Sequence, residues 1–204
     1  MILSKKGKLS VHTIVEEDTA KVLQYFSENT FNCDRESGAL RPSNTQFMCI
    51  MKDIISGKDD ESNIFVLKRN NEVLGYVSMF VDYDRLVIGH IAVDKNARGK
   101  GYGTYLTRVA IDVAEHTGRG VRLYCSHPNP VFAKMDFTTP DGIHFYHEHK
   151  KRILNPNKYP PLFVDKETYA SRQAERQKQE VERFSKFLNS GIMDVLNNLD
   201  GKYM

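Results

Sequence analysis

The sequence predicts a mixed α/β domain with a mostly antiparallel sheet, followed by a helical C-terminal extension. Three apolar runs between residues 63 and 93 follow one another with only tight turns between them, which is typical of antiparallel strands. An apolar run, a helix-patterned run and a further apolar run then follow in order, which indicates a parallel strand pair joined by a helix. We therefore assign residues 1–160 to the domain and 161–204 to the extension.

The bulk composition is that of an ordinary globular protein. The 204 residues are 40% hydrophobic and carry a formal net charge of +3, which is too small to argue for nucleic-acid binding by itself. No stretch approaches the roughly 20 apolar residues that span a bilayer, and the N-terminal MILSKKGKLS contains no apolar signal core. Cys33, Cys49 and Cys125 form no C-x-x-C pair, which fits a reducing compartment. We expect a cytoplasmic protein without a membrane partner.

The first part of the chain is predicted to form a strand and two helices. Residues 8–15 have the pattern of a short strand, and residues 17–29 place apolar side chains on one helical face. Residues 32–44 are rich in Gly, Pro, Asn and Ser, which indicates a loop. Ser43 stands where a helix over 44–56 needs an N-cap. The apolar stripe expected on that helix consists of Phe47, Ile50, Met51, Ile54 and Ile55.

The strand series follows. Asn70 and Asn71 separate runs 63–69 and 72–82, and because asparagine tolerates positive φ we expect a tight hairpin there. A second turn leads into a strand over 86–93. The later elements expected are a helix over 105–116 that Gly118 and Gly120 end, a strand over 121–126, a short helix over 130–137 and a strand over 142–153.

The tail over 165–200 has the pattern of a helix. Its middle is almost wholly polar, whereas its last part carries apolar residues spaced for one face, namely Val181, Phe184, Leu188, Ile192 and Val195. This pattern indicates that the helix docks on the domain or on a second copy of the chain, as in a homodimer. A disordered tail is the competing interpretation.

The stretch ARGKGYGT, residues 97–104, lies between the strand expected over 86–93 and the helix expected over 105–116. A helix N-terminus offers unpaired N–H groups and a partial positive charge, so phosphates bind there readily. Glycines let the backbone turn and approach a ligand, and Arg98 and Lys100 add positive charge. The spacing of a nucleotide P-loop is absent, and the dinucleotide fingerprint lacks its last glycine. The stretch therefore predicts a phosphate cradle, with a ligand-free glycine turn as the alternative.

At these residues the sequence resembles the GNAT superfamily of acyl-CoA-dependent N-acetyltransferases. Arg98-Gly99-Lys100-Gly101-Tyr102-Gly103 matches that family's [Q/R]-x-x-G-x-[G/A] pyrophosphate loop, and Ile91-Ala92-Val93-Asp94 looks like the end of its fourth strand. The resemblance covers about residues 8–150 and implies a GNAT-like sheet whose parallel strand pair splays apart at the cofactor site. It also implies acetyl-CoA as co-substrate.

The resemblance assigns cofactor-binding roles to particular residues. The N–H groups of the loop and of the helix start, residues 99–104, would hold the pyrophosphate, with Arg98 beside them. The backbone of residues 91–93 would pair with the pantetheine arm. Asn129 looks like the asparagine that contacts that arm. The full set is Ile91, Ala92, Val93, Arg98, Gly99, Lys100, Gly101, Tyr102, Gly103, Thr104 and Asn129.

The catalytic groups depart from the family pattern. No Asp or Glu lies between Leu86 and Val93, and His90 is the titratable side chain there, so it is the candidate base. The alternative is a satisfied, partly buried strand residue, and a bulge would decide which face it takes. Phe132 stands where the family's acid Tyr usually stands, and phenylalanine has no proton to give. Tyr124 and Tyr146 are substitutes, or the thiolate leaves unaided.

A metal site is not predicted. His144, His147 and His149 cannot gather on one face of either a strand or a helix. We therefore expect an enzyme that moves an acetyl group from acetyl-CoA to a primary amine, carried by a small molecule or a protein, by direct attack in a ternary complex. A non-catalytic acyl-CoA-binding or protein-interaction module is the alternative. Nucleic-acid binding through the tail is disfavoured, because its charges are mixed.

Overall fold

The computed structural model describes residues 1–28, 42–124, 132, 134–140, 144–148 and 162–200; for Tyr124, His144 and residues 188–200 it describes the backbone alone. The chain divides into two compact units, Met1–Val164 and Asp165–Met204. The described elements are β1 (Ile2–Lys6), β2 (Leu9–Thr13), η1 (Glu16–Asp18), α1 (Thr19–Glu28), α3 (Asn44–Ile55), β3 (Ser62–Arg69), β4 (Glu72–Asp82), β5 (Arg85–Val93), η2 (Lys95–Ala97), α4 (Tyr102–His116), β6 (Gly120–Tyr124), β7 (His144–His147) and α6 (Lys166–Asp200).

The first unit is built on one seven-stranded sheet in the order β1-β2-β3-β4-β5-β6-β7. Neighbouring strands are antiparallel except for β5 and β6, which run parallel and are joined by α4. The predicted mixed sheet with one parallel pair is therefore confirmed.

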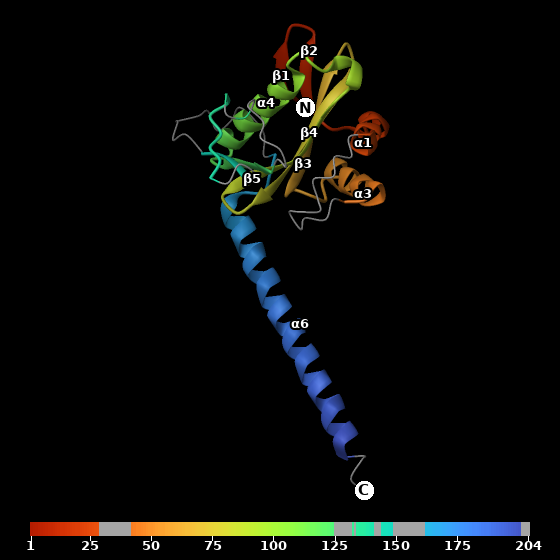
Figure 1. Cartoon of the computed structure of the whole chain (residues 1–204), viewed down its shortest axis with the longest axis vertical. Coiled ribbons are helices and arrows are strands. Elements are labelled where there is room, and N and C mark those ends of the chain that lie inside the picture. The colour runs from red at the N-terminus through yellow and green to blue at the C-terminus, as the bar shows by residue number, and fades with distance from the viewer. Residues whose placement is uncertain (29–41, 125–131, 133, 141–143, 149–161, 201–204) are drawn as a thin grey trace. The chain divides into compact units, whose positions relative to one another are not determined.

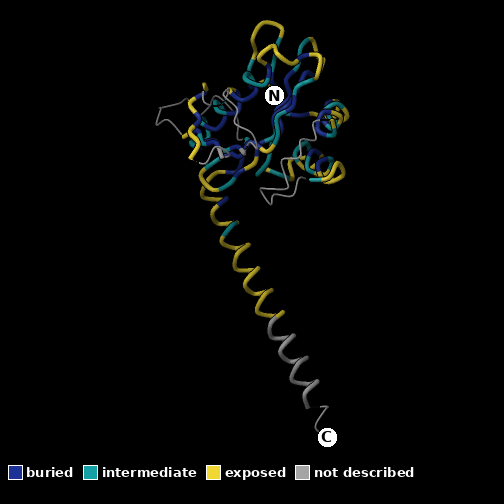
Figure 2. Tube along the Cα trace, viewed as in Figure 1, coloured by how far each residue is buried: buried dark blue, intermediate teal, exposed yellow. Residues whose placement is uncertain are grey.

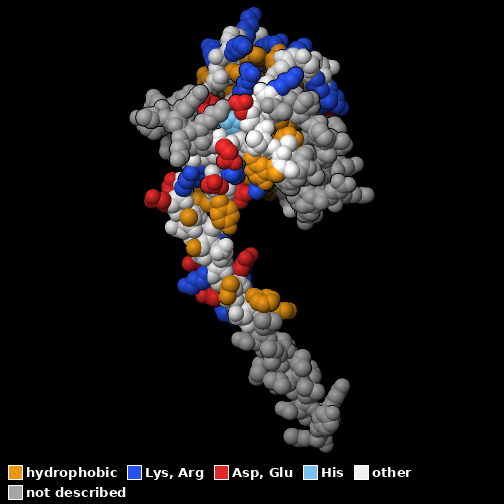
Figure 3. Space-filling view, turned by 60° about the vertical axis from the view of Figure 1, so that its left-hand side comes forward, with side chains coloured by type: hydrophobic (Ala, Val, Ile, Leu, Met, Phe, Trp, Pro, Cys, Tyr) orange, Lys and Arg blue, Asp and Glu red, His pale blue; other side chains and the backbone are white. Residues whose placement is uncertain are grey.

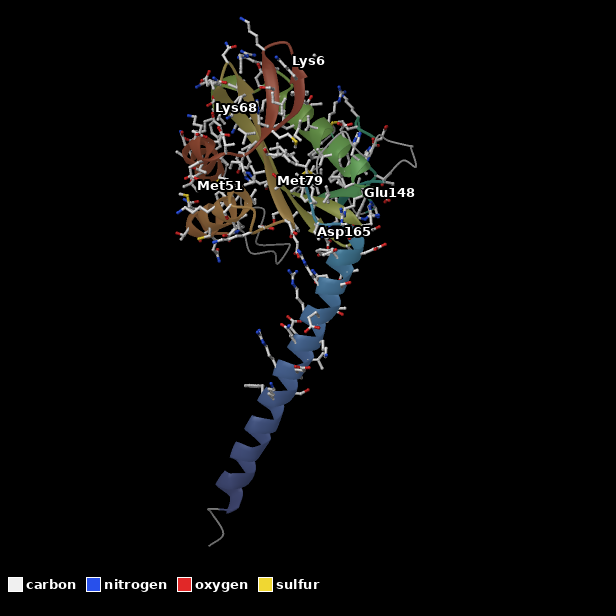
Figure 4. The ribbon with its side chains drawn as sticks, turned by 180° about the vertical axis from the view of Figure 1, so that it is seen from behind. Lys6, Met51, Lys68, Met79, Glu148 and Asp165 are labelled. Atoms are coloured by element: carbon white, nitrogen blue, oxygen red, sulfur yellow. The ribbon has the colours of Figure 1, made fainter. Side chains whose placement is uncertain are left out.

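Helices cover both faces of this sheet. Figure 1 shows α1 and α3 on one face and α4 on the other. The α1/α3 face holds a core cluster that includes Phe26, Phe47, Met51 and Tyr76. Figure 2 shows the buried residues along the sheet and the exposed residues on the outer sides of the helices. Figure 4 labels Met51, a fully buried residue of α3.

Local sequence signals account for several boundaries. Asn70 and Asn71 have φ of 49° and 67°, so the predicted tight turn between β3 and β4 is confirmed. Ser43 caps α3, because its side chain accepts a hydrogen bond from the Gln46 N–H while the Gln46 side chain accepts one from the Ser43 N–H. Gly118, with φ of 67°, follows the end of α4 as expected.

One strand escaped the sequence analysis. β1 precedes the predicted first strand and pairs with it, with Lys6 opposite Leu9 and Gly7 (φ 59°) in the turn. Its sequence ILSKK is short and largely polar, because it lies at the edge of the sheet and buries only Leu3.

The end of the first unit is fastened to the sheet. Arg119, which is buried, donates a hydrogen bond from Nη2 to the Val164 carbonyl at 2.8 Å, and the Val164 N–H donates to Asp60 O at 2.7 Å. The Asn63 side chain donates to Leu162 O, and the Phe163 ring meets Phe65 edge-on. Residues 162–164 therefore belong to the core of this unit.

The second unit is the helix α6. Its side chains are described as far as residue 187, and Val181, Phe184 and Phe187 are exposed. The predicted face residues Leu188, Ile192 and Val195 lie where the side chains are not described. Among the described residues, no helix combines the length and the apolar character needed to cross a bilayer.

Candidate functional site

The middle of β5 contains a bulge. His90 pairs with Ser78 of β4, but the next pair is Ile88 with Met79, so Gly89 is an extra residue on β5. A Cβ added to Gly89 would lie 3.3 Å from Ser78 Oγ and 3.4 Å from Phe80 Cε1. Because directly opposite residues share a face, the bulge turns both Gly89 and His90 towards the side of the sheet that carries Tyr76 and Ala92, which is the α1/α3 face.

The parallel pair parts just before this bulge. The pairing of β5 with β6 runs from Arg85 and Gly120 to Ile88 and Leu123. Beyond Ile88, the described ladder partners of β5 all lie on β4, where Ile91 faces Val77 and Val93 faces Gly75. In the described part of the chain, no strand pairs with the other edge of residues 89–93. The splay expected beyond Ile88 depends on residues 125–131, which lie outside the described part of the chain.

The strand ends in a short loop held by Asp94. Asp94 Oδ1 accepts a hydrogen bond from the Asn96 N–H at 2.8 Å, and the Asp94 carbonyl accepts one from the Ala97 N–H. Asp94 Oδ2 accepts a bond from the hydroxyl of Tyr25, on α1, at 2.9 Å. The Tyr25 hydroxyl and the Asn96 N–H together hold the pKa of the Asp94 carboxyl below its usual value. Burial, and then the Asp94 carboxylate, raise the pKa of Tyr25.

Glycines turn this loop into α4. Gly99 and Gly101 have φ of 74° and 80°, which side chains other than glycine rarely adopt. Gly101 is the N-cap of α4, and the first intrahelical bond runs from the Tyr105 N–H to the Gly101 carbonyl. The N–H groups of residues 102–104 precede that bond and have no partner within the helix. The α4 start therefore presents backbone donors beside Val93, at the end of β5.

Two contacts hold this helix start in place. Arg69, at the end of β3, donates a hydrogen bond to the Tyr102 hydroxyl and lies over the Tyr102 ring, with Cζ 5.5 Å from its centroid. The hydroxyls of Tyr105 and Ser4 are 2.8 Å apart. The Tyr102 side chain therefore packs against Arg69, whereas the Tyr102 N–H is one of the helix-start groups without a partner within α4.

Positive charge gathers around the loop. Arg98 and Lys100 are exposed, Arg98 Nε donates to Val93 O at 3.3 Å, and Lys100 Nζ lies 3.4 Å from Asn96 O. Figure 3 shows Lys and Arg side chains gathered at the end of the unit that carries the β1–β2 hairpin, and Figure 4 labels Lys6 and Lys68 at that end. An anion approaching the α4 start therefore meets favourable charge.

His90 lies on the α1/α3 face beside two aromatic rings. Its Nδ1 is 2.6 Å from the hydroxyl of Tyr76, and the two rings stack with centroids 5.4 Å apart. The Phe26 ring meets the imidazole edge-on, also at 5.4 Å. Tyr76 is fully buried, whereas His90 is half-buried. The imidazole is therefore fixed in orientation by its neighbours.

The structure brings most predicted site residues together in one strand-loop-helix segment. Residues 90–93 form the end of β5, and residues 98–104 form the loop and the first turn of α4. Asn129 lies outside the described residues. Phe132 packs against the rings of Phe137 and Phe145, as expected for an apolar residue.

Sequence reasoning missed several supporting residues. Tyr25, Asp94 and Tyr76 act through contacts between segments far apart in the chain, and their sequence signals were those of ordinary helix, turn and strand residues. Among the described residues, no group of three His, Cys, Asp or Glu side chains is placed to hold a metal ion. His149 and the side chain of His144 lie outside that description.

The comparison with known families agrees with this geometry. The model of the acetyltransferase (GNAT) family matches residues 24–137, which is more than half of the chain. The chain belongs to the GNAT acetyltransferase family. No curated protein matches it in sequence.

Solved structures of GNAT proteins share its fold. The ribosomal-protein-S18-alanine N-acetyltransferase of Escherichia coli matches with a TM-score of 0.51 and 18% identity, over 72% of this chain and 97% of that one. The spermidine N-acetyltransferase of Vibrio cholerae matches with a TM-score of 0.56 and 14% identity, over 72% and 98%. The PaiA N-acetyltransferase of Thermoplasma acidophilum, solved with coenzyme A, matches with a TM-score of 0.54 and 13% identity, over 70% of this chain and 99% of that one.

Proposed function

We propose that this GNAT protein transfers an acetyl group from acetyl-CoA, the co-substrate of its family, to a primary amine by direct attack in a ternary complex. The observation that carries the proposal is the glycine-turned start of α4 beside the end of β5, where the described part of the chain pairs β5 on its β4 side only. A pyrophosphate needs fixed donors and positive charge, and a pantetheine arm needs strand-like partners. Residues 89–104 contain groups of both kinds, which supports the proposal.

The cofactor residues follow from this arrangement. The N–H groups of residues 99–104 would bind the pyrophosphate, with Arg98 and Lys100 supplying charge. The backbone of Ile91, Ala92 and Val93 would pair with the pantetheine arm on the edge with which no described strand pairs. Asn129, outside the described residues, keeps its proposed contact with the arm on the resemblance alone.

His90 is the proposed general base, and its contact with Tyr76 constrains how it works. An imidazole has one lone pair in its neutral form. For Nε2 to take a proton from the amine, Nδ1 must carry the ring hydrogen and donate it to the Tyr76 oxygen, 2.6 Å away. That bond would then also stabilise the imidazolium that forms. The opposite direction, with Tyr76 donating to Nδ1, would leave a structural histidine.

The neutral amine nitrogen attacks the thioester carbonyl carbon, the C–S bond breaks, and one amine proton passes to His90 Nε2. The thiolate of coenzyme A leaves unaided or takes a proton from solvent, since a thiol pKa is near 8.5. Backbone N–H groups near the Gly89 bulge are candidates for the developing oxyanion.

Two matched glycine variants test the cofactor site by calorimetric titration with acetyl-CoA. Gly101 and Gly118 both have positive φ, and an added Cβ at either meets no atom within 4 Å. Gly101→Ala and Gly118→Ala should therefore lose similar stability, about 1 kcal/mol. Gly101→Ala and Arg98→Ala should lose acetyl-CoA affinity, whereas Gly118→Ala, at the far end of α4, should keep it. A folded wild type that does not bind acetyl-CoA would overturn the proposal.

Phe132 favours a second candidate function, a non-catalytic acyl-CoA-binding or interaction module. Phenylalanine at that position supplies no proton, and its ring is occupied by packing. A screen of primary amines against the acetyl-CoA-bound protein separates the two functions. Acetylation that His90→Gln slows by about a hundredfold or more supports the enzyme, whereas binding without turnover of any amine supports the module.

We also propose that α6 pairs with α6 of a second copy. Val181, Phe184 and Phe187 are 65%, 62% and 71% exposed, and an isolated helix gains little stability in water without a packed apolar face. Sedimentation equilibrium of the wild type should then show a dimer, and a Phe184→Ser, Phe187→Ser variant should be monomeric. Lys178→Ser, Lys186→Ser serves as the control on the same helix and should remain dimeric. A monomeric wild type would refute this pairing.

A further inference from the structure

Ser78 is a serine of the central strand β4 that lies beside the proposed base. It is directly opposite His90 in the pairing of β4 with β5, so both side chains are on the α1/α3 face. The Cβ atoms of opposite residues in an antiparallel pair are about 5 Å apart. The Ser78 hydroxyl and the His90 imidazole are therefore neighbours, although they come from different strands.

The fold does not use the Ser78 hydroxyl for a hydrogen bond. In the described part of the chain its Oγ has no such partner, whereas the hydroxyls of Ser4 on β1 and Ser10 on β2 each have a side-chain partner. Ser78 is half-buried, and its Oγ is not one of the described buried polar atoms that lack a partner. A hydroxyl that is not fully buried and has no partner among the described residues is therefore held next to the base.

The same hydroxyl lies against the bulge of β5. Ser78 Oγ would be 3.3 Å from a Cβ added to Gly89, so it packs beside the backbone at that residue. Backbone N–H groups near this bulge are the candidate donors to the oxyanion. During attack the acceptor nitrogen must lie between the thioester carbon and the base. Ser78 is therefore beside the position at which that nitrogen would react.

We propose that Ser78 Oγ accepts a hydrogen bond from the acceptor nitrogen and thereby selects primary over secondary amines. This inference rests on the proposed acetyl transfer and concerns the acceptor of that same site. In the attack the nitrogen lone pair bonds to the carbonyl carbon, and one N–H proton passes to His90 Nε2. The second N–H is donated to Ser78 Oγ and stays on the amide nitrogen of the product. The Ser78 hydroxyl keeps its own proton throughout.

Hydrogen-bond lengths allow one nitrogen to meet both groups. Each partner of an N–H group lies about 3 Å from the nitrogen, so two acceptors up to about 5 Å apart can share one amine. A neutral primary amine has two N–H groups and supplies a donor to both acceptors. A secondary amine has only one, and because the departing proton must reach the base, Ser78 receives no donor. Ser78 is therefore a specificity-determining residue that contacts the acceptor without taking part in proton transfer.

Methylamine and dimethylamine test this inference, because both are small and they differ in the number of their N–H groups. The measurement is kcat/KM for each amine at saturating acetyl-CoA, in the wild type and in Ser78→Ala. In the variant we expect kcat/KM for methylamine to fall about fivefold, as for one lost hydrogen bond, and that for dimethylamine to change by less than about twofold. The acetyl-CoA Kd and the urea midpoint should not change, because no described residue is hydrogen-bonded to the Ser78 hydroxyl.

Ser62→Ala is the matched control. Ser62 is also a half-buried strand serine on the α1/α3 face, where it is opposite Phe80. It lies on β3, however, and β4 separates it from His90 on β5. Its substitution should leave kcat/KM unchanged for both amines.

The outcomes separate this inference from the function on which it rests. Equal losses for the two amines in Ser78→Ala overturn the amine selection and leave acetyl transfer intact, because a hydroxyl that serves the oxyanion or the fold would affect both amines alike. An unchanged kcat/KM for methylamine overturns the selection as well. So does a wild type that acetylates other primary amines but not methylamine. A wild type that binds acetyl-CoA but acetylates no primary amine overturns both proposals.

Discussion

Asp94 connects the first helix of the domain to the loop that precedes α4. Its two carboxylate oxygens accept from the Tyr25 hydroxyl on α1 and from the Asn96 N–H in the loop. A shift of α1 would therefore displace the loop, because this carboxylate is hydrogen-bonded to both. Because α1 lies on the same face of the sheet as His90, Asp94 couples the base side of the site to the proposed cofactor cradle.

The lowered pKa of Asp94 gives this contact a pH signature. A carboxyl whose pKa is lower in the folded state stabilises the fold fully above its unfolded value of 3.8, and this contribution is lost as the pH falls through the lower folded value. Asp94→Asn should cost about 1 kcal/mol at pH 7, a modest figure because the group is partly exposed. Urea unfolding should show the difference from wild type shrinking below about pH 4. A pH-independent difference would contradict the hydrogen-bond explanation.

Tyr76 should act on catalysis only through His90. Tyr76→Phe removes the oxygen that orients the imidazole, and we expect kcat to fall about tenfold, as when an orienting hydrogen bond is lost. In a His90→Gln background the same substitution should have no further effect on kcat. The acetyl-CoA Kd should not change in either background. Equal losses in both backgrounds would show that Tyr76 stabilises the fold rather than the base.

At the scale of the element, the start of α4 contains two glycines with different structural roles. Gly101 requires its positive φ, whereas Gly103 lies in the helix, where a Cβ would be 4.0 Å from Val93 Cγ2. Gly103→Ala should therefore raise the free energy of unfolding by up to about 1 kcal/mol, because alanine is the better helix former. Its methyl group would also narrow the approach to the helix start. Calorimetry should show weaker acetyl-CoA binding by this more stable variant, and unchanged binding would contradict a role for Gly103 in ligand approach.

Strongly local signals predicted the elements well. The asparagine pair at 70–71 and the serine at 43 act within four residues, so their turn and cap were readable and are confirmed. The bulge at Gly89 could not be located, because it depends on the register between β4 and β5 and not on the sequence of β5 alone. β1 was missed because an edge strand buries too little to need an apolar pattern. The sequence therefore predicted the loop of the candidate site, but not the contacts from distant segments that support it.

At the scale of the whole molecule, the boundary between the two units predicts which C-terminal residues the first unit requires for folding. The sequence predicts a domain over residues 1–160, and the first compact unit of the structure comprises Met1–Val164. A chain of residues 1–164 should fold and bind acetyl-CoA, because the hydrogen bonds of residues 162–164 with the rest of the first unit are kept.

A chain ending at residue 160 provides the contrast. It lacks the buried Phe163 and Val164 and leaves the Arg119 guanidinium without its carbonyl partner. We expect a loss of about 3 kcal/mol in the free energy of unfolding. Urea denaturation of the two truncated chains gives the comparison, and equal stability would show that residues 162–164 are dispensable.

The extra residue at Gly89 also has an evolutionary consequence. Side chains alternate along a strand with a period of two, and a bulge adds one residue that this alternation does not need. Deleting Gly89 would therefore leave Ile88 opposite Met79 and His90 opposite Ser78, with both side chains on the faces that they occupy now. A second residue inserted beside Gly89 would instead exchange the faces of all residues on one side of it. Among descendants of this gene, loss of Gly89 should therefore be compatible with the core more often than a further insertion in β5.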